Sequence, residues 1–368
     1  MEKLHMVDLQ GQYLRLKKDI DQAIGEVIQS AAFINGPQVK EFAAKLENYL
    51  RCKKVIPCAN GTDALQIALM ALKLQPGDEV IVPDFTFIAT AEVIALLGLK
   101  PVFVDVDEQT FLLDTEKLNK AISPKTKVII PVHLYGQCAN MEEIMDLAEK
   151  HKLYVIEDNA QAIGADIQIK GKWQKAGTIG HIGCTSFFPS KNLGCYGDGG
   201  ALYTNDPLLG EEIACIANHG AKVKYYHDMV GINSRLDTLQ AAILNVKLNH
   251  LDSFGKARRN AADRYDVLLS GIPQIKTPTR VKHSTHVFHQ YTLIVERRAE
   301  LQSFLASKGI PTMIYYPVGM HHQKAYKTND VLPVSDKLCQ SVLSLPMHTE
   351  LSVGQQEYIA GAIKSFYE

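Results

Sequence analysis

The chain has 368 residues, of which 46% are hydrophobic and 21% are charged, and its formal net charge is −1. This composition is that of a globular protein and argues against a dedicated nucleic-acid or membrane-surface binder. The length exceeds the ~250–300 residues of a typical single core, so two domains are expected. Glu92 and Lys100 interrupt the most apolar stretches, and the seven cysteines show no paired spacing. We therefore expect no membrane span and a cytoplasmic protein with reduced thiols.

The first part of the chain predicts a large α/β domain over residues 1–255, with an extended arm and a helix at 13–30 lying against it. Within this domain, short apolar runs alternate with helical patterns. Strands are predicted at 79–83, 101–106, 127–132, 153–157, 184–188 and 201–204, and helices at 63–74, 90–97 and 141–151. This alternation is typical of a mostly parallel sheet wrapped by helices, in which ligands bind beyond the carboxyl ends of the strands.

The remaining chain predicts a smaller α+β domain over residues 256–368. Two helical patterns, at 234–251 and 256–270, lead into it. The segments that follow predict a strand, a helix, a second strand and a closing helix, at 286–295, 301–308, 312–316 and 355–366. The predicted boundary therefore lies near residue 255.

Two candidate ligand contacts occur early in the chain, each next to a predicted element. Gly61 and Thr62 lie in a turn that opens a helix, where free N–H groups and the positive helix end form a natural phosphate seat. A plain helix capped by Thr62 or Asp63 would look the same. Phe87 follows a predicted strand and could lie flat on a planar cofactor or simply pack in the core.

Two further candidates are a carboxylate and a guanidinium. Asp158 follows the apolar strand at 153–157 and should point out of its carboxyl end. A carboxylate there could keep a pyridinium nitrogen protonated, or it could cap the next segment. Asn233 and Arg235 precede a long helix, and Arg235 suits recognition of a carboxylate or phosphate, with a surface ion pair as the alternative.

The most informative segment runs from 185 to 201, where Lys191 follows a short aromatic strand and enters a loop with four glycines. Lysine is normally a surface residue, and glycines let a bulky group approach the backbone closely. An amine withdrawn from water has a lowered pKa and can form a Schiff base with a carbonyl. Glycine-flanked lysines also occur in ordinary loops, so Lys191 needs partners.

Together these features describe one chemistry. A Schiff-base lysine, a carboxylate for a pyridinium nitrogen, a phosphate seat and a stacking ring are the parts of a pyridoxal 5′-phosphate site. In this order they resemble fold-type-I pyridoxal phosphate enzymes. The chain is identified as a member of the DegT/DnrJ/EryC1/StrS family of sugar-nucleotide aminotransferases on motifs at 60–64, 77–80, 83–86, 131–136, 156–161, 186–191 and 197–201.

The resemblance assigns roles to particular residues. Lys191 would form the Schiff base and move the proton, and Asp158 would pair with the pyridine nitrogen. Gln161 would contact the 3-hydroxyl side of the cofactor, and Phe87 would stack on its ring. The residues that would bind the phosphate are Gly61, Thr62 and Ser186, joined by Asn233 of the neighbouring subunit in a homodimer with shared sites.

The resemblance also implies a reaction. L-Glutamate would donate an amino group to a nucleotide-linked keto-sugar for cell-surface polysaccharide or lipopolysaccharide. Relatives with histidine in place of Lys191 remove a hydroxyl instead, so the lysine favours transamination. The segments 184–200 and 233–242 look closest to the branch that aminates UDP-2-acetamido-2-deoxy-3-oxo-glucuronate. A dTDP-linked 3-keto or 4-keto-6-deoxy sugar, or a non-catalytic regulator, remains the alternative.

Several residues are candidate substrate contacts or are open to more than one interpretation. Arg235 could meet the uronate carboxylate, while Tyr316, His321 and His322 are candidate sugar or nucleotide contacts, in a region that matches the family less closely. His133 could border the cofactor or be a hydrogen-bonded core residue. The spacing of the histidines at 283–289 would place them on opposite faces of a strand, so no metal site is expected.

Overall fold

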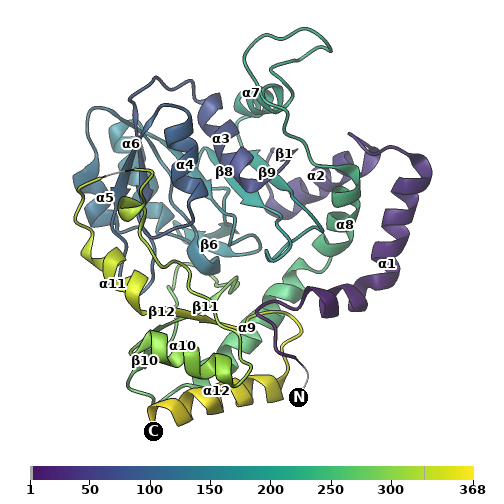
Figure 1. Cartoon of the computed structure of the whole chain (residues 1–368). Coiled ribbons are helices and arrows are strands. Elements are labelled where there is room, and N and C mark those ends of the chain that lie inside the picture. The colour runs from purple at the N-terminus through teal and green to yellow at the C-terminus, as the bar shows by residue number, and fades with distance from the viewer. Residues whose placement is uncertain (1–2, 327) are drawn as a thin grey trace.

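The computed structural model describes residues 3–326 and 328–368, and a seven-stranded sheet organises the larger part of it (Figure 1). Strand β9 runs antiparallel to both of its neighbours, β1 and β8. The strands β8, β5, β4, β2 and β3 pair in parallel. In spatial order the strands are β1 (Lys54–Cys58), β9 (Gly200–Thr204), β8 (Ile182–Ser186), β5 (Tyr154–Asp158), β4 (Thr126–Ile129), β2 (Glu79–Pro83) and β3 (Lys100–Val104). The fold class is therefore the predicted α/β class.

Helices cover both faces of this sheet. Side chains alternate along each strand, so Val80 and Val82 pack in one hydrophobic cluster while Ile81 packs in another. The first face is covered by α3 (Gly61–Ala71), α4 (Ala89–Leu96) and α7 (Pro207–Ala217). The second face is covered by α2 (Pro37–Leu50), α5 (Thr115–Ala121), α6 (Met141–His151) and α8 (Thr238–Leu248).

A three-stranded antiparallel sheet organises the C-terminal part, below the large sheet in Figure 1. Its order is β10 (Ile275–Lys276), β11 (Tyr291–Val295) and β12 (Val342–Leu345), packed with α9 (Leu251–Leu268), α10 (Arg298–Ser307) and α12 (Val353–Tyr367). Helix α11 (Pro333–Ser341) precedes β12. Residue 255, the predicted boundary, lies inside α9, and the two-domain division stays a prediction.

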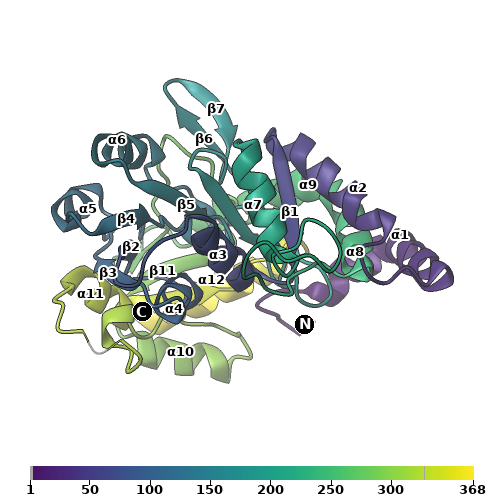
Figure 2. The same ribbon diagram turned by 90° about the horizontal axis from the view of Figure 1, so that it is seen from above.

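The N-terminal segment contacts both parts of the chain. Helix α1 (Leu9–Ser30) lies along α8, and Leu16 and Ile20 of α1 pack against Ile243 (Figure 2). The arm before it was expected to lie against the large domain. Leu4 is instead buried in the cluster of the C-terminal sheet, and the N–H of Met347 donates to the carbonyl of Met6 (3.1 Å).

The structure corrects two predicted strands. Within 286–295 only β11 is a strand, because Phe288 has a positive φ of 45° and the Val287 N–H donates to the Gly136 carbonyl. The segment 312–316 forms no strand, only a single bridge between Met313 and Ser344. Strands β1 and β12 and the hairpin β6 (Asp166–Ile169) with β7 (Lys172–Lys175), which extends from the body in Figure 2, were not predicted.

Two short 3₁₀ turns, η1 (Leu134–Gly136) and η2 (Met320–His322), lie in loops of the structure. Among the helices of the described residues, none combines the length and the apolar character that crossing a membrane would require.

Candidate active site

The candidate residues gather at the carboxyl edge of the large sheet, as expected for parallel strands. Strand β5 ends at Asp158, β8 ends at Ser186, and α3 begins three residues after the end of β1. The segment after β2 contains Phe87, and Lys191 follows β8. Residues spread over more than 130 positions of the chain are thereby brought to one edge.

Asp158 is buried, with 6% of its surface exposed, and its carboxylate is held by two donors. The hydroxyl of Thr90, in the first turn of α4, donates to Oδ2 (2.8 Å), and the N–H of Ala160 donates to Oδ1 (3.1 Å). The Ala160 contact is the local capping that sequence reasoning left open for Asp158. Thr90 of helix α4 holds the other oxygen, Oδ2, so both oxygens of the carboxylate are fixed and its orientation is defined.

Lys191 lies in a tight turn beside Asp158. Its N–H donates to the Phe188 carbonyl (2.8 Å), and the Cys195 N–H donates to the Phe187 carbonyl (2.8 Å). A side chain at Gly194 would overlap the Pro189 carbonyl, so the turn requires glycine there.

Burial lowers the pKa of the Lys191 amine to about 8, and the negative charge of Asp158 opposes this shift. The Lys191 amine therefore lies within range of the electrostatic field of the Asp158 carboxylate. A lysine with a lowered pKa is partly unprotonated near neutral pH, which is the state that attacks a carbonyl carbon.

A helix starts near the expected position, at Gly61, but its cap differs from the prediction. Asn60, not Thr62 or Asp63, caps α3, and its side-chain oxygen accepts the N–H of Asp63 (2.8 Å). The first N–H groups of a helix have no partner inside the helix, which leaves those of Gly61 and Thr62 for a ligand. A Cβ at Gly61 would lie 2.7 Å from the Cβ of Ser186, so glycine allows α3 to start directly against the end of β8.

An aromatic and amide cluster lies next to this seat. Phe87 is 52% exposed, and its ring centroid is 6.2 Å from that of Tyr316. The Gln161 side chain accepts the N–H of Tyr135 (2.7 Å) and donates to the Tyr316 hydroxyl (3.1 Å). The ring of Phe87 is therefore open to a ligand and is not packed in the core. Gln161 is held by two hydrogen bonds, three residues after Asp158.

The remaining candidates, Asn233, Arg235, His321 and His322, make other contacts in the structure. Asn233 is exposed and its side-chain oxygen accepts a hydrogen bond from the Arg235 guanidinium. The hydroxyl of Ser234 accepts the N–H of Ala59 (3.0 Å), which places the segment beside the start of α3. His321 is buried against Asp84, and His322 is largely exposed.

His133 is a core residue, which resolves the alternative that the sequence left open. It is fully buried, and its Nδ1 accepts the N–H of Ala139 (3.2 Å), so Nε2 carries the proton and donates to Glu157 (2.7 Å). Glu157 also accepts the N–H of Ile179 (2.7 Å). The histidines at 283–289 lie mostly outside regular strands; His286 stacks on Phe288, with ring centroids 3.8 Å apart.

Sequence reasoning missed two residues near the site. Thr90 was read only as part of a helix, although its place in the first turn of α4 next to Phe87 was a usable signal. His289 is buried, and burial lowers its pKa well below the usual value, with the positive charges of Lys191 and Arg258 adding to this effect. A neutral imidazole near the Lys191 amine had no signal in the sequence.

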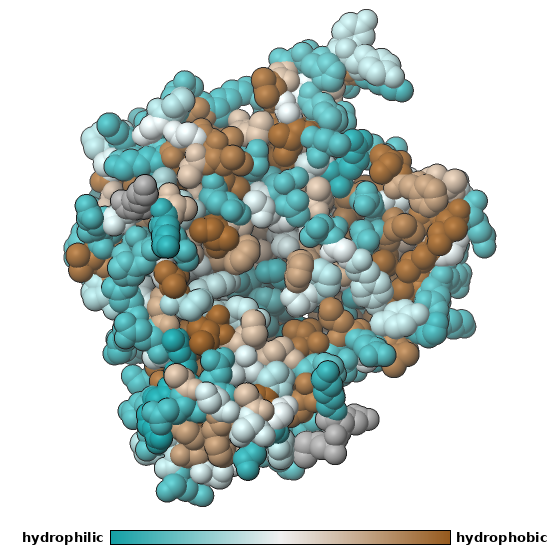
Figure 3. All heavy atoms as spheres, viewed as in Figure 1, coloured by the Kyte–Doolittle hydropathy of each residue, from teal (hydrophilic) through white to brown (hydrophobic). Residues whose placement is uncertain are grey.

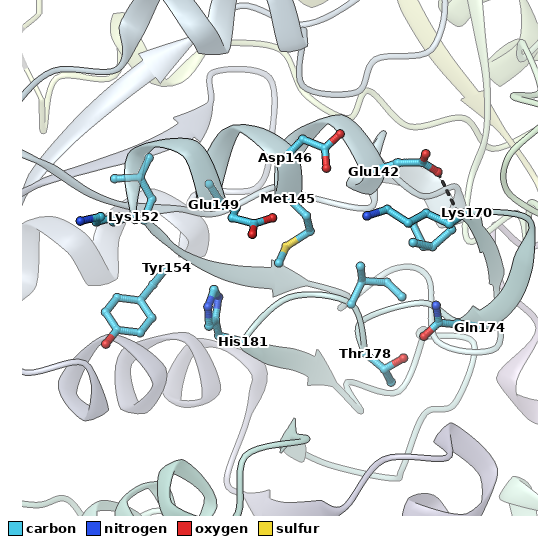
Figure 4. A pocket seen from close by; sticks show the side chains of 14 residues that line it. Glu142, Met145, Asp146, Glu149, Lys152, Tyr154, Lys170, Gln174, Thr178 and His181 are labelled. Carbon is cyan, nitrogen blue, oxygen red and sulfur yellow. Dashed lines mark hydrogen bonds between the residues drawn. The ribbon is translucent and has the colours of Figure 1, made fainter.

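A groove elsewhere on the molecule lies between α6, the start of β5 and the β6–β7 hairpin (Figure 4). Acidic side chains of α6, among them Glu142 and Asp146, line one wall, and Tyr154 and His181 face them. Because Tyr154 begins β5 and Asp158 ends it, the groove lies at the edge opposite the candidate site. The candidate site is identified by its side-chain chemistry, and the groove contains none of those residues.

The fold and the site define a class: fold-type-I enzymes that depend on pyridoxal phosphate. The residues present fit this cofactor, because they supply a half-buried amine, an oriented carboxylate, an open aromatic face and a glycine-lined helix start. The DegT/DnrJ/EryC1/StrS aminotransferase family model matches residues 14–364, and the chain belongs to this family.

Curated relatives match nearly the whole chain. A "pleiotropic regulatory protein" of Geobacillus stearothermophilus is 48% identical over 98% of this chain and 98% of its own. A UDP-2-acetamido-2-deoxy-3-oxo-D-glucuronate aminotransferase of Pseudomonas aeruginosa is 46% identical over 98% and 99%. A UDP-N-acetyl-3-dehydro-alpha-D-glucosamine 3-aminotransferase of Acidithiobacillus ferrooxidans is 45% identical over 98% and 96%.

Solved structures agree with the fold. DesV of S. venezuelae, crystallised with a ketimine intermediate, superposes with a TM-score of 0.96 and is 38% identical over 100% of this chain and 99% of its own. NtdA of Bacillus subtilis, which contains the cofactor PMP, has a TM-score of 0.92 and is 32% identical over 100% and 86%. Pyridoxal phosphate and its amino form are therefore the cofactors of this family.

Proposed function

We propose that this protein is a pyridoxal phosphate-dependent sugar-nucleotide aminotransferase, moving an amino group from L-glutamate to a keto-sugar. The observation that carries the proposal is the buried Asp158 carboxylate, held by Thr90 at the end of β5, in a chain that belongs to this aminotransferase family. The relatives and structures named above are sugar aminotransferases or share their fold, which supports the same reaction class.

The cofactor, when bound, supplies the electron sink that stabilises a carbanion next to the transferred nitrogen. Asp158 would hold the ring nitrogen protonated, with its carboxylate oriented by Thr90. The Lys191 amine would carry the proton between the two carbons that exchange it, which its lowered pKa favours near neutral pH. Both residues therefore act as catalytic residues.

Five residues would bind the cofactor without moving a proton. Phe87 would cover one ring face and Gln161 would contact the side of the 3-hydroxyl. Phosphate binding would fall to the N–H groups of Gly61 and Thr62 and the hydroxyl of Ser186, since a helix start favours an anion.

We infer that the acceptor is UDP-2-acetamido-2-deoxy-3-oxo-glucuronate, an intermediate for cell-surface polysaccharide or lipopolysaccharide. The names of two relatives at 46% and 45% identity both describe a UDP-linked 2-acetamido sugar oxidised at carbon 3. Arg235 is the proposed partner of the uronate carboxylate, because a guanidinium suits bidentate recognition of a carboxylate, and its side chain is held by Asn233. Tyr316, His321 and His322 remain proposed substrate contacts, and Tyr316 is the one next to Gln161.

We also propose a homodimer with shared active sites. Large apolar side chains are exposed at and after α1, where brown atoms gather in Figure 3, namely Leu14, Ile28, Phe33 and Ile34. Asn233 is exposed and forms a bridge with Asn218, which follows α7 directly; the loop between them projects after α7 in Figure 1. A second copy would cover both features and let Asn233 reach the neighbour's phosphate.

Two further properties belong to this proposal. Residues 1–255 and 256–368 form two domains, supported by their separate sheets. A cytoplasmic location is supported by the seven cysteines, none of which is paired within the described residues.

Absorbance tests the proposal directly. The purified protein should bind pyridoxal phosphate and turn yellow, and Lys191→Ala should abolish this colour. L-Glutamate should bleach the yellow form by converting the cofactor to its amino form, and UDP-2-acetamido-2-deoxy-3-oxo-glucuronate should restore it. Restoration only by dTDP-linked or 4-keto sugars would overturn the acceptor and keep the reaction class; no cofactor binding would favour a regulator.

A further inference from the structure

A cluster of two histidines and one aspartate lies outside the catalytic residues. It joins η2, which contains His321 and His322, to the first turn of α11, which contains Asp336. One ligand atom from each residue lies within 4.8 Å of the other two. We propose that these three side chains bind a divalent cation of the Zn²⁺ type, although no metal site was expected from the sequence.

One of the spacings between these atoms already fits tetrahedral coordination, and a second is that of a hydrogen bond. Asp336 Oδ1 is 3.4 Å from His321 Nε2 and 2.9 Å from His322 Nε2. With metal–ligand distances of ~2.0–2.2 Å, two ligands of a tetrahedral zinc ion lie about 3.3–3.5 Å apart. Small rotations of the exposed His322 would complete the geometry. Two imidazoles and one carboxylate suit Zn²⁺, and water would take the fourth position.

A second carboxylate fixes the proton on His321. Asp84 accepts the main-chain N–H of His321 at Oδ1 (2.7 Å) and lies 2.8 Å from its Nδ1 at Oδ2. The imidazole Nδ1 therefore carries the proton, which leaves Nε2 as a lone pair directed to Asp336 and His322. A carboxylate behind a histidine is the arrangement that orients metal-binding imidazoles.

The Nε2 of His321 supports a ligand over a simple polar network. His321 is only 3% exposed, and within the described part of the chain its Nε2 has no hydrogen-bond partner. A buried polar atom without a partner costs about 1–3 kcal/mol, so such atoms in folded proteins call for an unseen partner. An ion pair between His322 and Asp336 alone would leave this atom unsatisfied, whereas a cation satisfies all three groups.

A cation here would fix the loop at η2 and the start of α11 to the end of β2. Asp84 follows β2 directly, and Phe87 lies three residues further along the same segment. The site would therefore be structural and would brace the segment that presents the aromatic face. Because the cation would occupy the imidazoles of His321 and His322, this inference replaces their role as proposed substrate contacts.

Metal binding to the full-length cofactor-loaded protein tests the proposal. After dialysis against a chelator, calorimetric titration with Zn²⁺ should show one ion per chain. Titration with Co²⁺ should give the intense visible absorbance of tetrahedral coordination. His322→Ala and Asp336→Asn should each weaken Zn²⁺ binding by tenfold or more, and Asp84→Asn by about 10–100-fold through His321.

The matched control is His151→Ala, since His151 is exposed at the end of α6 and remote in sequence from the cluster. Because the cofactor can itself bind cations, the test compares the Zn²⁺ affinity of wild type with that of His322→Ala. His322 is exposed and can be replaced without disturbing the core. Equal Zn²⁺ affinity in wild type and His322→Ala, or no binding by wild type, would overturn the proposal.

Discussion

At the scale of single residues, the lowered pKa of Lys191 sets the reactivity of the site. Burial favours the neutral amine and the charge of Asp158 favours the ammonium, and burial dominates. The neutral fraction of a lysine with a pKa of about 8 rises through the pH range in which enzymes work, whereas that of an ordinary lysine rises only near ~10.4.

The first prediction follows from this pKa. The rate at which cofactor-free protein combines with pyridoxal phosphate should rise with pH, because only the neutral amine attacks the aldehyde carbon. Stopped-flow absorbance should show a midpoint near pH 8. A midpoint above pH 10, as for an exposed lysine, would show that Lys191 is not withdrawn from water.

Asp158 gives the second prediction. In Asp158→Asn the amide oxygen can still accept the Ala160 N–H, and the amide NH2 can donate to the Thr90 hydroxyl. The neutral amide cannot keep a ring nitrogen protonated. Glutamate-dependent bleaching should slow by about 10²–10³-fold, the usual effect of removing one preorganised electrostatic group. Asp146→Asn, on the surface groove of α6, is the control. Equal slowing in both variants would contradict the proposal that Asp158 keeps the ring nitrogen protonated.

At the scale of elements, α8 supports the loop that carries Lys191. Lys247 is almost completely buried, its ammonium donates to the Gly194 carbonyl (2.8 Å), and it lies 4.4 Å from the centroid of the Tyr196 ring. Burial lowers its pKa to about 8, and the negative charge of a Cys195 thiolate would oppose this. The helix thus holds the glycine loop by one charged contact.

Lys247 therefore makes the stability of the protein depend on pH. A lysine whose folded pKa lies below its unfolded pKa of 10.5 is less protonated in the folded state between about pH 8 and 10.5. The free energy of unfolding of cofactor-free wild type, measured relative to Lys247→Met, should rise over this window by about 2–3 kcal/mol. Denaturant unfolding at several pH values measures it. A difference independent of pH would contradict the buried charge.

The elements also show which features the sequence could predict. Helix α6, which has strong apolar periodicity, has the predicted bounds, and β2 has the bounds expected from its apolar run, whereas the other predicted helices differ by one or more residues at one or both ends. The segment 312–316 looked like a strand because it is apolar and aromatic, yet Tyr316 is used to contact Gln161 and Phe87. The short strand β1 was missed because Pro57 and Lys54 obscure its pattern.

The candidate site was predictable in part for a physical reason. Lys191, Asp158 and Gly61 each sit at a strand end or helix start, where local sequence signals are strong. Thr90, His289 and the cluster around His321 depend on contacts between segments far apart in the chain. The sequence named His321 as a candidate and included His289 in a histidine series, but their contacts between distant segments emerged only from the fold.

At the scale of the whole molecule, the shared-site dimer makes a prediction about mixtures. Lys191→Ala and Asn233→Ala should each have little activity alone. In a mixed dimer one site has Lys191 from one copy and Asn233 from the other, so both are intact there. Random exchange of subunits should then restore about a quarter of wild-type activity. Activity of the mixture equal to the mean of the two variants would show that each site is built from one chain.

The proposed function requires that one cofactor ring binds between the Lys191 amine and the Asp158 carboxylate. A crystal structure of the yellow, cofactor-loaded protein measures this arrangement most directly. We predict that pyridoxal phosphate is joined covalently to Lys191, with its ring nitrogen within hydrogen-bond distance of Asp158 and its phosphate at the start of α3. A cofactor bound elsewhere, or a ring nitrogen directed away from Asp158, would contradict the proposed function.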